Sequence, residues 1–387
     1  MKMRYRPFGQ LGWDVSPLGF GTMRLPVIDG DTSRIDVEKA SLMLRSAIDS
    51  GMNYVDTAYP YHGGKSEACV GKILRDGYRE KVKLATKLPI WDVKTTDDFF
   101  RYLEIQLTRL ETNTIDLYLI HALNEKHWEK TKKLKLLDAA EKARSEGLIG
   151  HFGFSFHDQL PVFEKILREY DGWEFCQIQY NFMDVDYQAG RRGLEAAADR
   201  GLAVVIMEPL KGGQIAAPPP RETIPLWEEL GADLADGRNQ HVELSLKWLW
   251  DQPEISVVLS GMSTEEQVQQ NLHSAARSAP HAFSDAQRQI FDRLRTAYSS
   301  LQKIGCTGCG YCMPCPNGVN IPRNLLIYNE VHMYGDLEQP RRVYHLVFSE
   351  QEQAGNCIEC GQCEEKCPQN LPIIETLKKA HEQFRRP

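Results

Sequence analysis

The stretch Asn53-Tyr54-Val55-Asp56-Thr57-Ala58-Tyr59-Pro60-Tyr61 decides which fold the sequence predicts. A short apolar run ends in the carboxylate of Asp56, and the phenol of Tyr61 follows five residues later, beyond a proline. This pattern is typical of a buried parallel strand that ends at a functional edge of a sheet. A surface turn with incidental polar groups would look the same locally, so the flanking sequence has to separate the two interpretations.

Strand-like and helix-like segments alternate on both sides of this stretch. Short apolar segments predict strands at Val15–Met23, Asn53–Asp56, Val82–Lys87, Ile115–Ile120, Ile149–Ser155, Phe175–Tyr180, Ala203–Met207 and Ile255–Ser260. Helices are expected after them, at Val37–Ser50, Ser66–Leu74, Thr95–Leu110, Leu134–Glu146, Leu160–Tyr170, Gly190–Arg200, His241–Trp250 and Thr264–Ala276. Eight such pairs predict an α/β protein with a closed (β/α)8 TIM barrel rather than an open doubly wound sheet.

The composition limits the classes of function. The net charge of −7 gives no reason to expect a nucleic acid or an anionic membrane as partner. No apolar run reaches the ~20 residues that span a bilayer. The basic residues Met1–Arg6 are not followed by an apolar segment, so we expect no secretory signal and a cytoplasmic protein.

Four titratable residues lie at or just after the ends of three successive expected strands. Asp56 and Tyr61 follow the second strand, Lys87 ends the third, and His121 ends the fourth. Each alone has an ordinary structural explanation. Because the carboxyl ends of barrel strands meet at one mouth, the four together predict an active site there.

These residues lie in motifs that resemble the aldo-keto reductase family. The motifs are Asp56-Thr57-Ala58-x-x-Tyr61, Ala85-Thr86-Lys87, Asp116-Leu117-Tyr118-Leu119-Ile120-His121, Gly153-Phe154-Ser155, Gln177-Ile178-Gln179-Tyr180-Asn181, Pro209-Leu210-Lys211-Gly212-Gly213 and Gly261-Met262-Ser263 with Asn271. The resemblance covers essentially residues 1–280. It implies a barrel enzyme that transfers hydride between NADH or NADPH and a carbonyl compound, which is an aldehyde, a ketone or a sugar.

The chemistry of carbonyl reduction supports the same four roles. A ketone needs a proton for its developing alkoxide, and a tyrosine with a pKa near 10 is a poor acid–base catalyst at neutral pH. An ammonium about 4 Å away can lower the pKa of a phenol by about 3 units. We therefore expect Tyr61 to donate the proton, Lys87 to lower the pKa of Tyr61, Asp56 to keep Lys87 charged, and His121 to orient the carbonyl.

The resemblance also implies residues that bind the nicotinamide cofactor. Ser155 and Gln179 match positions that hydrogen-bond the carboxamide, and Met207 stands where an aromatic ring often stacks on the nicotinamide. Phe156 replaces the asparagine of many members, so one carboxamide contact is expected to be lost. The other expected cofactor residues are Gly21, Thr22, Met23, Pro209, Leu210, Gly212, Gly261, Met262, Ser263, Gln267 and Asn271.

The choice between NADH and NADPH stays open. The junction Ser260–Thr264 should place a helix N-terminus near the phosphates of the dinucleotide. Many NADPH-preferring members carry a lysine and an arginine there, whereas this chain has Gly261 and Gln267. Preference for NADPH is therefore in doubt, and NADH becomes a plausible cofactor.

Eight of the ten cysteines crowd into the C-terminal part, in two runs. They are Cys306, Cys309, Cys312, Cys315, Cys357, Cys360, Cys363 and Cys367. The second run, ending in Cys363-x3-Cys367-Pro368, has the spacing of bacterial ferredoxins, and the first run is one residue shorter. Because the fourth cysteine of each ferredoxin run ligates the other cluster, we expect two [4Fe–4S] clusters with exchanged ligands. Zinc is the alternative, since two Cys-x2-Cys pairs can hold it.

The sequence between and before these runs suggests the domain organisation. Arg323–Tyr334 and Pro340–Phe348 look helical, which resembles an α-helical ferredoxin arrangement. We expect a barrel over residues 1–280, a connecting helix within 281–304 and a small, mainly α-helical ferredoxin-like domain over 305–387. The long segment Lys211–Gln240 is expected to be a functional lid or a disordered loop. Cys69 and Cys176 are expected to be buried apolar residues.

Three functions fit these observations. The first is an NAD(P)H-dependent oxidoreductase acting on a small carbonyl or alcohol, with clusters that serve electron transfer to a ferredoxin-like partner, sensing or stability. The second is a non-enzymatic, cofactor-binding electron-relay or docking protein. The third is a redox-neutral epimerase with retained NAD. Because a nicotinamide moves two electrons together and a cluster normally moves one, we expect the clusters to stay outside the hydride step.

Overall fold

The computed structural model describes residues 3–234 and 239–385. The chain forms two compact units, each built from two stretches of sequence. The first comprises Met1–Pro209 and Ser245–Phe283, and the second comprises Leu210–Leu244 and Ser284–Pro387. The break at Phe283 lies near the predicted boundary at residue 280, whereas the transfer of residues 210–244 to the second unit was not predicted.

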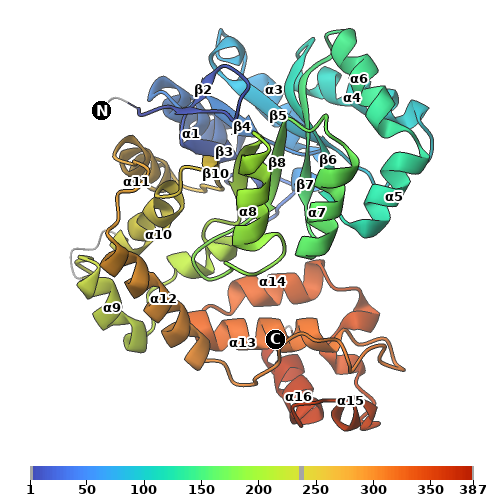
Figure 1. Ribbon diagram of the computed structural model, residues 1–387, viewed down its shortest axis with the longest axis vertical. Coiled ribbons are helices and arrows are strands. Elements are labelled where there is room, and N and C mark those ends of the chain that lie inside the picture. Colours follow the sequence, from blue (N-terminus) through green and yellow to red (C-terminus); the bar gives the residue numbers. More distant parts are fainter. Residues whose placement is uncertain (1–2, 235–238, 386–387) are drawn as a thin grey trace. The chain divides into compact units, whose positions relative to one another are not determined.

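The first unit is a closed barrel of eight parallel strands, as predicted (Figure 1). The strands follow one another around the barrel in chain order, and the last one, β10, pairs with the first, β3. Their bounds are β3 Leu18–Gly21, β4 Tyr54–Asp56, β5 Lys83–Leu88, β6 Ile115–Leu123, β7 Ile149–Phe156, β8 Phe175–Gln179, β9 Ala203–Met207 and β10 Ile255–Ser260. The stretch Asn53–Tyr61 therefore contains a barrel strand, and the interpretation as a surface turn is excluded.

A short hairpin closes the amino-terminal end of the barrel. Strand β1 (Arg6–Pro7) pairs antiparallel with β2 (Asp14–Val15), and Phe8 between them is fully buried. The Phe8 ring lies 5.9 Å from the rings of both Tyr54 and Phe175, which point into the barrel. This end is thus filled by apolar side chains and leaves the opposite end for polar groups.

Along each strand, the side chains on the inner face of the barrel change from apolar to polar toward the carboxyl end. Tyr54, Ala85, Leu119 and Phe175 belong to the apolar cluster inside the barrel. Two residues further along the same strands, on the same face, come Asp56, Lys87, His121 and Gln177. The strand geometry alone therefore gathers these polar side chains at the carboxyl end.

Helices surround the strands, and the eight predicted ones are all present (Figure 1). Their bounds are α1 Val37–Asp49, α3 Ser66–Ile73, α4 Asp97–Leu110, α6 Leu136–Ser145, α7 Leu160–Glu169, α8 Gly190–Asp199, α10 Gln240–Trp250 and α11 Glu265–Ala276. Helix α5 (Glu125–Lys133) was missed because six of its nine residues are charged. It buries only Trp128 and Thr131, and the Asn124 side chain caps its first turn.

The second unit is helical, as predicted for the cysteine-rich part. Its helices are α9 Ile224–Glu229, α12 Asp285–Ser300, α13 Ile321–Tyr334, α14 Glu338–Leu346, α15 Gln362–Glu365 and α16 Ile373–Phe384. The segment Lys211–Gln240 is not a structureless loop, because it contains α9 and two short 3₁₀ turns, although its residues 235–238 lie outside the described part. Lys211 pairs with Glu330 of α13 at 3.3 Å, which ties the start of this segment to the helical core.

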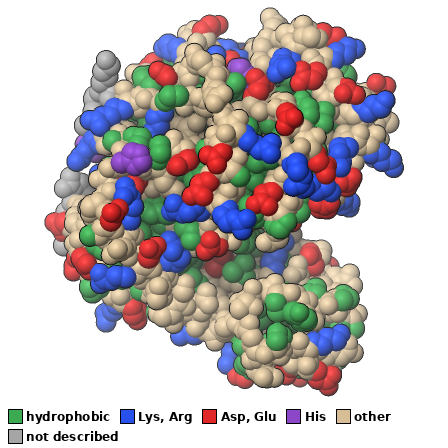
Figure 2. Space-filling model, in the orientation of Figure 1, with side chains coloured by type: hydrophobic (Ala, Val, Ile, Leu, Met, Phe, Trp, Pro, Cys, Tyr) green, Lys and Arg blue, Asp and Glu red, His purple; other side chains and the backbone are tan. Residues whose placement is uncertain are grey.

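Acidic and basic side chains are interspersed on the face shown in Figure 2. Among the described residues, no helix combines the length and the apolar character needed to cross a bilayer.

Candidate functional site

The four predicted catalytic side chains come together at the carboxyl end of the barrel. Lys87 Nζ donates to Asp56 Oδ1 at 2.6 Å and to the carbonyl oxygen of Thr57 at 2.8 Å. The same nitrogen lies 5.2 Å from the centre of the Tyr61 ring. The rings of Tyr61 and His121 are 6.2 Å apart and nearly perpendicular. Residues separated by up to 65 positions thus form one cluster.

The ion pair between Lys87 and Asp56 is almost completely withdrawn from water. The side chains are only 2% and 4% exposed. Burial alone would lower the pKa of Lys87, but the neighbouring Asp56 carboxylate and Tyr61 phenol outweigh it, so this pKa is raised. Lys87 therefore stays positively charged at neutral pH.

The predicted lowering of the Tyr61 pKa is wrong for this structure. Burial raises the pKa of the Tyr61 phenol, and Lys87 opposes this without outweighing it. The attraction of the Lys87 ammonium favours the phenolate, but the cost of placing an anion in a site shielded from water is larger. Tyr61 is consequently protonated near neutral pH, which is the form of a proton donor.

His121 is held in its neutral form. Burial lowers the pKa of His121 well below its usual value, and the positive charge of Lys87 adds to this effect. Within residues 3–234 and 239–385, its buried Nδ1 atom has no hydrogen-bond partner. The ring of Trp91 lies 5.0 Å away and provides an aromatic neighbour at the mouth. A neutral imidazole can donate one hydrogen bond to a carbonyl oxygen placed here.

A fifth polar residue completes this cluster, and the sequence argument did not assign it a role. Gln177 Nε2 donates to Asp56 Oδ2 at 2.6 Å, so the two carboxylate oxygens have different partners. Gln177 is 1% exposed. The two-residue period from Phe175 places it on the inner face of β8, and this signal was available in the sequence.

Tyr61 begins the short helical turn α2 (Tyr61–Gly64), which is held from two sides. The two ring nitrogens of His62, which follows Tyr61, lie 2.7 Å from the carbonyl oxygen of Thr32 and 3.1 Å from that of Thr22, and a neutral imidazole can donate to one of the two. Both His62 and Gly63 have positive φ, which a glycine adopts at low cost. These contacts limit the positions available to the Tyr61 phenol.

The predicted carboxamide-binding residues lie at the ends of neighbouring strands. Ser155 is on β7 and Gln179 ends β8, next to it in the barrel, while Met207 ends β9. The Ser155 hydroxyl oxygen accepts from the backbone N–H of Ala122 at 2.8 Å. Phe156 packs against Phe163 of helix α7, on the outer side of its strand.

The predicted phosphate-binding junction between β10 and α11 is ordered by its own side chains. Gln267 accepts from the Ser263 N–H at 2.8 Å, and Asn271 donates to the Ser260 hydroxyl at 3.0 Å. Met262 is buried. A Cβ on Gly261 would come within 3.1 Å of the Cδ methylene of Arg24, a basic residue that the sequence motifs did not include.

The remaining expected cofactor residues occupy varied environments. Gly21 ends β3, and Met23 is 55% exposed, while the Thr22 hydroxyl donates to the carbonyl oxygen of Asp56 at 3.0 Å. Pro209 ends the first stretch of the barrel unit, and Leu210 and Gly212 belong to the second unit.

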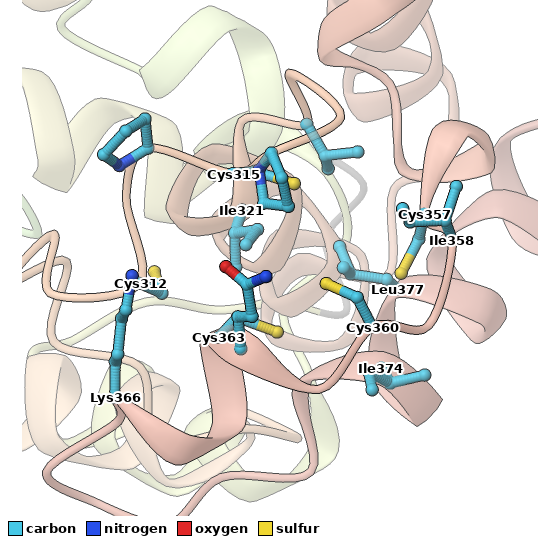
Figure 3. Close-up of a pocket in the computed structure, with 14 residues that line it drawn as sticks. Cys312, Cys315, Ile321, Cys357, Ile358, Cys360, Cys363, Lys366, Ile374 and Leu377 are labelled. Carbon is cyan, nitrogen blue, oxygen red and sulfur yellow. The ribbon is translucent and has the colours of Figure 1, made fainter.

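The eight clustered cysteines border two separate pockets in the second unit. Pocket A is lined by Cys315, Cys357, Cys360 and Cys363, and Figure 3 shows the last three sulfurs directed toward one space. Pocket B is lined by Cys306, Cys309 and Cys367, with Cys312, which also borders pocket A. The last cysteine of each run therefore borders the same pocket as the first three of the other run.

The thiols are spread around these pockets rather than gathered at one point. All ten cysteines lie in the described part and are unpaired thiols, and Cys69 and Cys176 are buried as predicted. In the part of the chain that the structure describes, no three His, Cys, Asp or Glu side chains are close enough to hold one metal ion. Four thiols are a ligand set for either a [4Fe–4S] cluster or a zinc ion.

Comparison with protein families gives two matches along the chain. Residues 17–293 match the model of the aldo/keto reductase family, and residues 305–371 match that of the 4Fe-4S dicluster domain. The chain belongs to the aldo-keto reductase family. Its barrel is that of an oxidoreductase, and its C-terminal part is an iron–sulfur domain.

Individual relatives agree with this assignment. The NADH-specific methylglyoxal reductase of Escherichia coli is 24% identical over 76% of this chain and 99% of its own length. An uncharacterized oxidoreductase of Bacillus subtilis, YqkF, is 26% identical over 70% of this chain and 91% of its own. The aldo-keto reductase AKR11C1 from Bacillus halodurans, in its holo form, superposes with a TM-score of 0.61 and 26% identity, covering 76% of this chain and 96% of that one.

In this aldo-keto reductase barrel, removing one partner of the ion pair should lower the free energy of unfolding more than removing both partners. Lys87→Met leaves the Asp56 carboxylate buried without its ammonium, which should lower the free energy of unfolding by about 3–5 kcal/mol. Asp56→Asn combined with Lys87→Met removes both charges and should recover most of this loss. Urea denaturation followed by tryptophan fluorescence measures both values. Equal destabilisation of the single and double variants would contradict the expected role of the unpaired carboxylate.

Proposed function

We propose that this aldo-keto reductase reduces a small aldehyde, ketone or sugar to the alcohol with NADH or NADPH. One geometric observation supports the proposal above all: the Tyr61 phenol, the Lys87 ammonium and the His121 imidazole meet at the carboxyl end of the barrel. Reduction of a carbonyl requires a proton donor and a hydrogen-bond donor at the same oxygen atom. The similarity to a methylglyoxal reductase supports a small carbonyl substrate.

Each residue of the cluster then has a defined task. The nicotinamide, when bound, supplies the hydride that adds to the carbonyl carbon. Tyr61 donates its phenolic proton to the carbonyl oxygen, and His121 donates a hydrogen bond that orients the same oxygen. Lys87 stabilises the phenolate that remains, while Asp56 keeps Lys87 charged. Trp91 contributes an apolar wall beside His121.

The residues at the mouth also accommodate the cofactor. Ser155, Gln179 and Met207 end or nearly end three neighbouring strands, where a nicotinamide ring would face Tyr61. Neither Gly261 nor Gln267 provides a cation for a 2′-phosphate, which supports NADH, but the aliphatic stem of Arg24 passes beside Gly261, and its guanidinium would be the candidate cation. Both dinucleotides are therefore retained in the proposal.

We propose further that the second unit holds two [4Fe–4S] clusters. Cys315, Cys357, Cys360 and Cys363 would hold one cluster, and Cys306, Cys309, Cys312 and Cys367 the other. Burial raises the pKa of the Cys363 thiol to about 11, so the cationic iron itself has to favour its thiolate form. Because clusters pass single electrons, we assign them to exchange with a ferredoxin-like partner, sensing or stability.

Tyr61→Phe tests the proton donor directly. The variant lacks only the hydroxyl group, so it should keep dinucleotide affinity and lose at least 10²-fold in kcat for carbonyl reduction. NADH and NADPH oxidation with methylglyoxal as the trial substrate, followed at 340 nm under anaerobic conditions, gives the rate. Tyr59→Phe, two positions earlier and outside the cluster, is the matched control. Unchanged turnover in Tyr61→Phe would refute the role of Tyr61.

The protonation states predict a flat pH profile. Tyr61 and Lys87 both have raised pKa values, and His121 has a lowered one, so none of the three should titrate between about pH 7 and pH 9. The single-turnover rate of carbonyl reduction should be constant in this range and fall only in more alkaline solution, where the phenol loses its proton. A fall with an apparent pKa of about 7–8 would show instead that Lys87 dominates the ionisation of Tyr61.

Cys360→Ala separates the clusters from the hydride step. It removes one thiol from pocket A, so the iron content should fall from about eight toward four atoms per chain. Turnover of NAD(P)H with the carbonyl should persist. Iron and sulfide analysis after anaerobic purification is the measurement, with Cys69→Ala as the control that keeps all the iron. Complete loss of turnover in a folded Cys360→Ala protein would place the cluster in the hydride step.

A further inference from the structure

Helix α13 lies in the sequence between the two cysteine runs, and its side chains hold the backbone beside both of them. Two of its asparagines make these contacts. Asn324 is fully buried, and Asn329 is 3% exposed. A buried amide is costly unless its polar atoms have partners, so the partners of these two side chains show which segments the helix fixes.

Asn324 connects the end of the first run with the start of the second. Its Nδ2 atom donates to the carbonyl oxygens of Asn320 and Glu352, both at 2.8 Å. Its Oδ1 atom accepts from the backbone N–H of Ala354 at 3.1 Å. Asn320 lies five residues after the last cysteine of the first run, and Ala354 lies three residues before the first cysteine of the second run. Asn324 therefore brings together two segments that supply cysteines to pocket A.

The other ends of the two runs are fixed in the same way. The Oδ1 atom of Asn329 accepts from the backbone N–H groups of Lys303 and Ile304, at 2.9 and 3.1 Å, and its Nδ2 atom donates to the carbonyl oxygen of Ile304 at 2.8 Å. Ile304 precedes the first cysteine of the first run by two residues. Near the end of the second run, Glu364 Oε1 accepts from the backbone N–H of Ile374, in the first turn of α16, at 2.8 Å. These contacts are made by groups other than the expected iron ligands.

The helices of this unit share an apolar core to which the thiols contribute little. Its members include Leu325 of α13, Tyr344 of α14 and Phe384 of α16, which are each at most 1% exposed. Of the eight clustered cysteines, all of which lie in the described part, only Cys363 belongs to this core, and the others are partly buried or exposed. Burial of apolar surface stabilises a fold in proportion to the area removed from water, so most of this stabilisation does not depend on iron.

We propose that the second unit folds without its clusters, so that the two clusters are exchangeable occupants of preformed pockets. The inference rests on the proposed presence of [4Fe–4S] clusters in pockets A and B. Small metal-binding domains commonly unfold when the metal is lost, because their apolar core is too small to replace it. Here the core and the buried asparagines keep the two runs adjacent. Stability of the fold is therefore removed from the roles proposed for the clusters, and sensing and electron exchange are retained.

Hydrogen exchange of the full-length protein, with and without iron, tests this inference. A chelator of ferrous iron removes the clusters under anaerobic, thiol-reducing conditions, and mass spectrometry follows amide exchange in peptides from α13 and α16. Exchange in these helices should accelerate less than about tenfold, because their opening still has to expose the apolar core. Addition of ferrous iron and sulfide should restore about eight iron atoms per chain. A larger acceleration, toward the rates of an unfolded chain, would overturn the inference.

Asn324→Leu tests the contact between the runs. Leucine has a similar volume but makes none of the three side-chain hydrogen bonds, so exchange in α13 of the iron-free variant should be at least about tenfold faster than in the iron-free unsubstituted protein. Leu326→Gln, at a 42% exposed position of the same helix, is the matched control and should leave this exchange unchanged. Equal exchange in iron-free Asn324→Leu and unsubstituted protein would overturn the part assigned to Asn324.

Cys360→Ala provides a test that does not depend on the folding of Asn324→Leu. It removes an exposed thiol of pocket A and leaves Asn324 in place, so α13 should stay protected from exchange while the iron content falls. Loss of this protection in Cys360→Ala would contradict a preformed pocket.

The iron content of the unsubstituted protein separates this inference from the proposed function. About eight iron atoms per chain, combined with loss of helix protection on iron removal, would overturn the preformed pockets and leave the cluster proposal standing. Absence of iron and sulfide after anaerobic purification and reconstitution would overturn the cluster proposal and the exchangeable clusters together. Turnover that depends on Tyr61 is measured independently of both outcomes.

Discussion

The buried ion pair between Lys87 and Asp56 is the interaction on which the barrel site depends. Two opposite charges 2.6 Å apart and almost free of water are stable only when their remaining hydrogen-bonding groups are satisfied. Gln177 donates a hydrogen bond to the second carboxylate oxygen of Asp56, and the Thr57 carbonyl oxygen accepts one from Lys87. The charge of Lys87, the neutrality of His121 and the protonation of Tyr61 all follow from this pair and the burial around it.

The two ends of the barrel differ in the side chains that fill them: one end is apolar, and the other carries the polar site residues. At one end the hairpin places Phe8 against Tyr54 and Phe175, which makes an apolar plug. Two residues further along the strands the inner face becomes polar. Because inner-face residues lie two positions apart on a strand, one further step along each strand replaces an apolar side chain by a polar one. A few residues are therefore enough to define the site.

Two kinds of electron carrier are encoded in one chain. The barrel of an aldo-keto reductase handles electron pairs as hydride, whereas an iron–sulfur domain handles electrons singly. The second unit also includes residues 210–244, which follow β9 directly, and Lys211 in this segment pairs with Glu330 of α13. The segment between two barrel elements is therefore folded as part of the helical unit rather than as an independent loop.

The sequence by itself determined the barrel, the four catalytic candidates and the two cysteine runs, because each is expressed in local periodicity or spacing. It did not predict helix α5, whose charged sequence hides a narrow buried face, nor the inclusion of residues 210–244 in the second unit. Only the tertiary structure decided that Gln177 binds Asp56, that Asn324 links the segments beside the two cysteine runs, and that burial outweighs Lys87 at Tyr61. These outcomes depend on distances between distant residues and on how much water is excluded, and neither quantity is contained in a local pattern.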